Sequence, residues 1–114
     1  MNVTIYHNPR CRKSREALDY LKTNEVNTTV VEYLKDMFDE QKLNEIIFRL
    51  GVKPIDLIRI NESIWKEKFR GLNMSDGDLI QAMLDHPKLI ERPIIDNGVV
   101  AVVARPLENI EKLF

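Results

Sequence analysis

The single cysteine of this 114-residue chain, Cys11, lies within a cluster of positive charge. Residues 1–15 carry no acidic side chain and four basic ones, which are Arg10, Arg12, Lys13 and Arg15. Nearby cations stabilise the thiolate form of a cysteine over the thiol. A lone cysteine is more often a small buried hydrophobe, but charged and polar neighbours on both sides are a poor setting for a core residue. We therefore interpret Cys11 as a nucleophile.

Spacing around Cys11 separates the chemistries that such a nucleophile could perform. A phosphatase loop that holds a phosphoryl group between cysteine and arginine needs the arginine six positions later, where this chain has Ala17. Disulfide exchange within one motif needs Cys-x-x-Cys, and the fourth position here is Ser14, whose hydroxyl can donate a hydrogen bond to the sulfur. A Cys-x-x-Ser site begins a thiol reaction but cannot resolve it, so turnover requires an external thiol such as glutathione or a partner protein.

Two arginines far along the chain are candidates for the same site. Arg92 and Arg105, each followed by proline, flank a predicted hairpin. Two guanidinium groups at its open end would form a fork for a tetrahedral oxyanion, because arginine donates bidentate hydrogen bonds and stays charged. Spacing leaves equally open that they are solvated arginines paired with Glu91 or Glu108.

Arg59 and His7 are further candidates whose roles the residues alone leave open. Arg59 follows an apolar helix end and suits either a binding or a purely structural role. His7 could act as a base or ion-pair partner of the thiol, although a histidine at a strand end is often only a hydrogen-bonded structural residue.

The elements that position these residues follow from periodicity. Alternation over residues 3–6 predicts a strand, residues 11–23 carry a helical stripe, and residues 28–33 are rich in β-branched residues. A β-α-β opening predicts two parallel strands with a right-handed crossover. Cys11 then lies at the first strand-to-helix junction, where free N–H groups and the positive end of the helix dipole also favour a thiolate.

The middle of the chain is predicted to be helical, over residues 39–51, 54–58, 61–70 and 75–85. The first of these helices has Asp39 as its N-cap and is ended by Gly51. The last begins at Ser75, which with Asp78 resembles a capping box.

The end of the chain is predicted to form a hairpin and a last helix over residues 106–113. The pair Asn97-Gly98 favours a two-residue type I′ turn, which pairs residue 92 with residue 103 and residue 90 with residue 105. The whole is one α/β domain over residues 1–114, ordered β-α-β, a helical insertion over about 39–86, then β-β-α.

Composition excludes several classes of protein. A net charge of −1 argues against general nucleic-acid or membrane-surface binding. The longest apolar run, residues 99–104, is far shorter than the roughly 20 residues that span a bilayer. One cysteine allows neither an internal disulfide nor a zinc ribbon, and we predict no metal site. Without a signal-peptide pattern, we expect a cytoplasmic location.

The motifs together resemble a known family. The segments Tyr6–Arg15, Leu84–Ile94 and Ala104–Pro106 are similar to those of glutaredoxin-coupled arsenate reductases, in particular the arsenate-reductase-like branch, which is related to Spx-type regulators. The resemblance covers essentially the whole chain. It implies a thioredoxin-like fold with a mixed four-stranded sheet and an inserted helical region.

The resemblance also implies roles for single residues. It makes Cys11 the nucleophile, gives His7 a part in keeping the thiol ionised, places Pro93 after a cis bond, and makes three arginines the oxyanion ligands: Arg59, Arg92 and Arg105. In the implied reaction the Cys11 thiolate attacks arsenate, glutathione attacks the adduct as co-substrate, glutaredoxin removes the mixed disulfide, and arsenite leaves. No cofactor is bound, and we expect a monomer. The alternatives are a glutathione-dependent thiol oxidoreductase of unknown substrate and a non-catalytic Spx-like adaptor.

Overall fold

The computed structural model describes residues 2–114, which form two compact units. The first unit contains the chain up to Asp36 together with Arg92–Phe114, and the second is Met37–Glu91. The second unit corresponds to the predicted helical insertion, whereas the prediction of one domain over 1–114 remains a prediction. No helix within residues 2–114 is long and apolar enough to cross a membrane.

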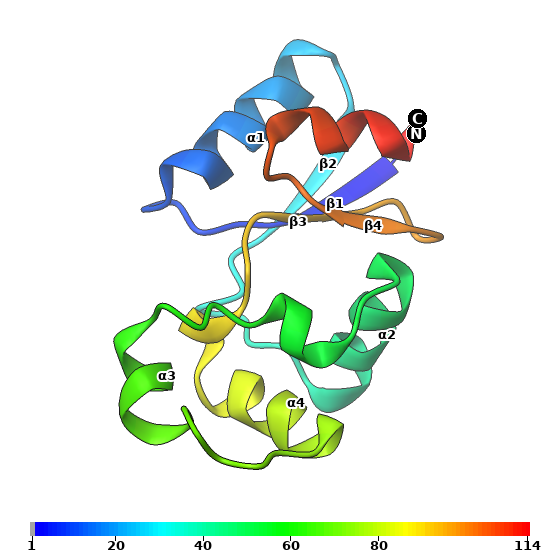
Figure 1. Ribbon diagram of the computed structural model, residues 1–114. Coiled ribbons are helices and arrows are strands. Elements are labelled where there is room, and N and C mark those ends of the chain that lie inside the picture. The colour runs from blue at the N-terminus through cyan, green and yellow to red at the C-terminus, as the bar shows by residue number, and fades with distance from the viewer. Residues whose placement is uncertain (1) are drawn as a thin grey trace. The chain divides into compact units, whose positions relative to one another are not determined.

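The first unit is built on a mixed four-stranded sheet with the strand order β2-β1-β3-β4 (Figure 1). Strand β1, Asn2–Tyr6, pairs in parallel with β2, Asn27–Val31, and antiparallel with β3, Ile94–Asp96. Strand β4, Ala101–Val103, pairs antiparallel with β3. The predicted β-α-β opening and mixed sheet are confirmed.

Two helices cover the same face of this sheet: α1, Arg12–Thr23, and the 3₁₀ helix η3, Leu107–Leu113 (Figure 1). The core between them and the sheet consists of apolar residues of which none is more than 3% exposed: Val3, Ile5, Ala17, Leu21, Ile95, Ala104, Ile110 and Leu113. Apolar residues three positions apart face one side of a 3₁₀ helix, which has three residues per turn. The predicted last helix is therefore present in the tighter 3₁₀ form.

The hairpin between β3 and β4 differs from the predicted two-residue turn. Asp96 pairs with Ala101, so residues 97–100 form a four-residue loop. The Asp96 carboxylate accepts from the Gly98 N–H at 2.7 Å, and Asn97 Oδ1 accepts from the N–H groups of residues 99 and 100 at 2.9 Å each. In this loop Gly98 has a positive φ of 93°, whereas a type I′ turn would need one at Asn97 as well.

The wider loop changes the register of the hairpin by two residues. Ile94 lies opposite Val103, and Ala104 donates its N–H to the Pro93 carbonyl at 2.9 Å. Continuing this register places residue 92 opposite residue 105, so the predicted pairing of 92 with 103 is wrong. A shift of two residues keeps every side chain on its face of the sheet, and it sets Arg92 across from Arg105.

The second unit is helical, as predicted. It contains α2 Glu40–Leu50, η1 Pro54–Leu57, α3 Ser63–Lys68, α4 Asp76–Asp85 and η2 Pro87–Leu89. Asp39 caps α2 by accepting from the Lys42 N–H at 2.7 Å, and Gly51 ends it at a φ of 69°. Ser75 and Asp78 form the predicted capping box of α4, with distances of 3.1 and 3.0 Å.

Candidate active site

A tight turn between β1 and α1 carries Cys11. Asn8 accepts two hydrogen bonds in this turn. Its backbone carbonyl accepts from the Cys11 N–H at 3.0 Å, and its side-chain Oδ1 accepts from the Arg10 N–H at 3.0 Å. Asn8 therefore closes the turn, a role that sequence reasoning missed although Asn-Pro favours turn initiation. Cys11 is the N-cap residue of α1, its side chain caps no N–H, and the first turn of α1 has no acidic residue. The positive end of the helix dipole thus faces the thiol without a neutralising carboxylate.

Arg105 hydrogen-bonds to the sulfur of Cys11, although the two residues lie 94 positions apart in the chain. Its Nη2 donates to Cys11 Sγ at 3.4 Å, and its Nε donates to the Arg92 carbonyl at 2.6 Å. The residue Cys11 is 7% exposed. The site therefore places a cationic donor that can bind an anion against a mostly buried sulfur.

Arg92, which lies opposite Arg105 in the hairpin, carries the second candidate guanidinium. Its Nε is buried and has no hydrogen-bond partner among the described residues. Buried donors without an acceptor are rare and costly in proteins, and each calls for an explanation such as a ligand. The Arg92–Pro93 bond is cis, as the resemblance implied, and Arg105–Pro106 is cis as well.

His7 and Ser14 are buried and hydrogen-bond to each other. His7 Nδ1 lies 2.6 Å from Ser14 Oγ, which also accepts from the Asn8 N–H at 3.0 Å. The predicted hydrogen bond from Ser14 to the sulfur is therefore replaced by bonds that join the end of β1 to α1. Ser14 contacts the Cys11 turn through Asn8.

Burial lowers the pKa of His7 below its ordinary value of 6.5. Glu32 opposes this effect, and the positive charges of Lys22 and Arg15 add to it. The imidazole is consequently neutral near pH 7, where it acts as a hydrogen-bonding partner or base and not as a cation. Its support of the thiol remains a prediction.

Comparison with known proteins places this chain in a family. The model of the ArsC family matches residues 6–113. The chain belongs to the ArsC family. It is 41% identical over 113 residues to an arsenate reductase of Neisseria meningitidis, covering 96% of this chain and 95% of the relative. It is 44% identical over 110 residues to the uncharacterised protein YfgD of Escherichia coli, covering 95% and 92%.

A solved structure shows the same fold. The arsenate reductase from Vibrio cholerae superposes on this ArsC-family protein with a TM-score of 0.95, at 37% identity, over 100% of this chain and 98% of that structure. The expected α/β fold of the thioredoxin-like arsenate reductases is therefore confirmed.

The third arginine implied for the ArsC-family site, Arg59, belongs to the second unit. Its Nη1 lies 2.8 Å from Glu62 Oε1, and its backbone N–H donates to the Leu89 carbonyl at 2.7 Å. One terminal nitrogen of this guanidinium is thus already bonded to a carboxylate. The assignment of Arg59 to the oxyanion site stays a prediction.

The basic cluster around Cys11 is largely engaged away from the sulfur. Arg12 and Lys13 share the carboxylate of Glu16 at 3.1 and 4.0 Å, and Arg15 donates to the Pro9 carbonyl at 2.9 Å. The cation that contacts the sulfur is Arg105, which lies in the segment after β4 and is not a sequence neighbour of Cys11.

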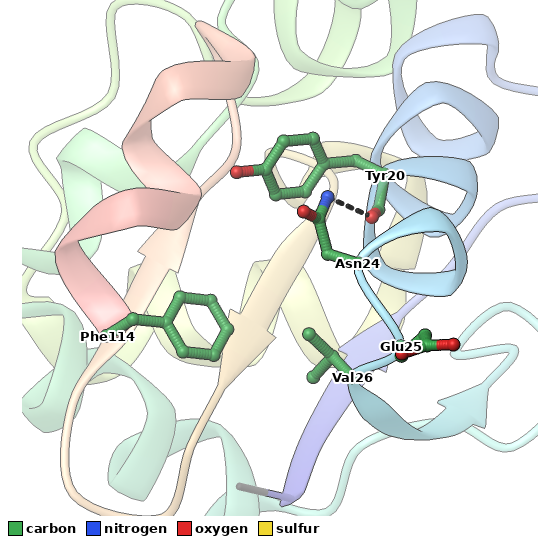
Figure 2. Close-up of a pocket in the computed structure, with 5 residues that line it drawn as sticks. All are labelled: Tyr20, Asn24, Glu25, Val26 and Phe114. Atoms are coloured by element: carbon green, nitrogen blue, oxygen red, sulfur yellow. Dashed lines mark hydrogen bonds between the residues drawn. The ribbon is translucent and has the colours of Figure 1, made fainter.

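A hollow of about 340 Å³ lies at the opposite end of α1 (Figure 2). Its lining consists of Tyr20, Asn24, Glu25, Val26 and Phe114. With a rise of 1.5 Å per residue, Tyr20 lies about 13 Å along the helix from Cys11. No predicted site residue lines this hollow. Within residues 2–114, no three His, Cys, Asp or Glu side chains are grouped to hold a metal ion.

Proposed function

We propose that this ArsC-family protein reduces arsenate to arsenite through Cys11, with glutathione as co-substrate and glutaredoxin as the partner that restores the thiol. The observation that carries the proposal is the hydrogen bond from Arg105 Nη2 to Cys11 Sγ at 3.4 Å. It puts an anion-binding group beside a sulfur at a helix N-terminus. Relatives that cover the chain nearly end to end bear the name arsenate reductase, which supports arsenate as the anion.

Arg92 and Arg105 have donors available for a tetrahedral oxyanion. Arg105 uses Nε and Nη2 for the contacts described above, which leaves its other terminal nitrogen. The Arg92 Nε has no partner but is buried, so an oxyanion would reach it only after the groups around it move. The family resemblance also makes Arg59 a ligand of the oxyanion, and its Nη1 lies 2.8 Å from Glu62 Oε1.

The reaction begins when the Cys11 thiolate attacks arsenic. A sulfur–arsenic bond forms, one arsenic–oxygen bond breaks, and the oxygen leaves as water after taking up protons; arsenic remains in the +5 state. A glutathione thiolate then attacks the Cys11 sulfur. The sulfur–arsenic electron pair passes to arsenic, arsenite in the +3 state leaves, and a disulfide joins Cys11 to glutathione.

Restoring Cys11 requires a thiol from outside the chain, because the chain contains a single cysteine. Glutaredoxin attacks the mixed disulfide on its glutathione sulfur, takes up the glutathionyl group and releases the Cys11 thiolate. Ser14 stands at the position where redox motifs place a second cysteine, and it hydrogen-bonds to His7 at 2.6 Å.

The proposal is tested by measuring arsenite formed from arsenate with glutathione and glutaredoxin. The wild type is expected to form arsenite and Cys11→Ser to form none. Equal rates in the two proteins would reject Cys11 as the nucleophile. Turnover of a glutathione mixed disulfide by the wild type, together with no arsenite, would favour the thiol oxidoreductase alternative.

A further inference from the structure

We propose that Asn109 is a positioning residue for Arg105 and thereby sets the reactivity of Cys11. This inference rests on the proposed function, in which Arg105 stabilises the Cys11 thiolate. The Asn109 side chain contacts neither the Cys11 sulfur nor the guanidinium groups of the candidate oxyanion ligands.

The side chain of Asn109 is bonded to the backbone on both sides of the β4 exit. Its Nδ2 donates to the Val103 carbonyl at 3.0 Å and to the Arg105 carbonyl at 3.2 Å. The Asn109 amide therefore bridges the last residue of β4 and Arg105 itself. Both bonds come from the interior of η3, so the helix and the strand end are joined at the residue that carries the guanidinium.

Arg105 is held at further points by the same segment. Its backbone N–H donates to the Val103 carbonyl at 2.8 Å, and its Nε donates to the Arg92 carbonyl at 2.6 Å. With the backbone and Nε both fixed, the terminal Nη2 is left directed at Cys11 Sγ, 3.4 Å away. Pre-ordering a long, flexible arginine lowers the entropy lost when it engages an anion.

The two Asn109 side-chain bonds are separable from the helix that carries them. The 3₁₀ hydrogen bond at this position runs from the Asn109 backbone N–H to the Pro106 carbonyl at 3.0 Å. Truncation of the side chain leaves that bond intact. The core residues of η3, Ile110 and Leu113, are buried independently of Asn109. The side chain can therefore be removed to test its effect on Arg105.

The test is a double-mutant cycle of Asn109→Ala and Arg105→Ala, read as the rate at which iodoacetamide alkylates Cys11. Rates are compared at one pH for all variants, because iodoacetamide reacts with the thiolate form of cysteine. We expect Asn109→Ala to slow alkylation about threefold. This effect is smaller than that of losing the whole hydrogen bond to a charged group, because Arg105 itself is still present. In the Arg105→Ala background it should slow alkylation no further, because the group it positions is gone.

Asn44→Ala is the matched control, because Asn44 Nδ2 donates to the Glu40 carbonyl at 3.0 Å in the second unit. It should leave the alkylation rate unchanged. Thermal unfolding is followed for each variant. If the alanine variant is unfolded at the assay temperature, Asn109→Leu replaces it, because leucine retains the side-chain volume but has no donor.

The possible failures point to different claims. Unchanged alkylation in the Asn109 variant, while Arg105→Ala is slowed, overturns the positioning role alone. Equal slowing by the Asn109 substitution with and without Arg105 overturns it as well. Unchanged alkylation in Arg105→Ala removes the thiolate stabilisation on which the proposed function also depends. The assay needs neither arsenate nor glutathione, so loss of arsenate reduction by itself does not change its outcome.

Discussion

Replacing Arg92 with methionine separates the role of this arginine in anion binding from any role in folding. Methionine keeps an unbranched stem but has no donor. The Arg92 carbonyl, which accepts from Arg105 Nε at 2.6 Å, belongs to the backbone and is retained. The substitution therefore removes the buried, unpartnered Nε and the terminal nitrogens while leaving the hairpin contact in place.

The expected effects on binding and on stability have opposite directions. A hydrogen bond to a charged group contributes about 1.5–3 kcal/mol, so its loss should raise the KM for arsenate about 10- to 150-fold. A buried donor without a partner costs about 1–3 kcal/mol, so its removal should stabilise the fold by about 1 kcal/mol. For a chain of this size, that gain corresponds to a Tm higher by about 4 °C.

The assay is arsenite formation at a series of arsenate concentrations, with thermal unfolding measured on the same preparations. Arg70→Met, at an exposed position of the second unit, is the control and should change neither quantity. A Tm that falls by several degrees with an unchanged KM would show that Arg92 is a structural residue and refute the argument from its unpartnered nitrogen.

Three further substitutions test the surroundings of Cys11. Arg105→Ala should slow alkylation of Cys11 about fivefold at a fixed pH, because it removes a partly exposed charged hydrogen bond that contributes about 1 kcal/mol. Arg12→Ala is the control and should have little effect, because the Arg12 side chain is 84% exposed. Since burial lowers the pKa of His7 below 6.5, the unfolded chain binds this proton more readily, and stability decreases as the pH falls below about 6.5. His7→Gln should therefore reduce the loss of Tm between about pH 7 and pH 5, and an unchanged loss would contradict the lowered pKa. Ser14→Ala leaves the buried His7 ring without its 2.6 Å partner and should cost about 2 kcal/mol in urea unfolding, whereas a cost near zero would show that this bond contributes nothing.

Local hydrogen bonding explains why much of the fold was predictable from sequence. Asp39 and Gly51 delimit α2, and Ser75 with Asp78 begins α4, because each of these signals acts within a few residues of the chain. Cys11 at the start of α1 follows from the same kind of argument. These features depend little on how distant segments pack.

The errors arose where more than one hydrogen-bond partner was available to the same group. Asn97-Gly98 favours a two-residue turn, but Asp96 and Asn97 both supply acceptors that close a four-residue loop instead. Ser14 was expected to donate to sulfur and instead bonds with His7 and Asn8. A sequence pattern does not rank such competing acceptors.

The central feature of the candidate site depends on tertiary structure. The contact between Arg105 and Cys11 joins residues 94 positions apart, and it requires both the sheet order and the hairpin register. Spacing alone left Arg92 and Arg105 undecided between a binding site and the surface, and only the family resemblance made them oxyanion ligands. Asn109 was missed altogether, since an asparagine within a terminal helix carries no signal of the two carbonyls that it bridges.

Protection of Cys11 by arsenate tests the central claim most directly, because it requires no external thiol and reports on the sulfur itself. Alkylation of the wild type by iodoacetamide is measured with increasing arsenate at constant ionic strength. We predict that arsenate slows alkylation to a plateau, and that Arg92→Met shifts the half-protecting concentration upward by at least about tenfold. An alkylation rate that arsenate leaves unchanged, or protection that Arg92→Met leaves at the same concentration, would contradict an oxyanion held beside Cys11 by these arginines.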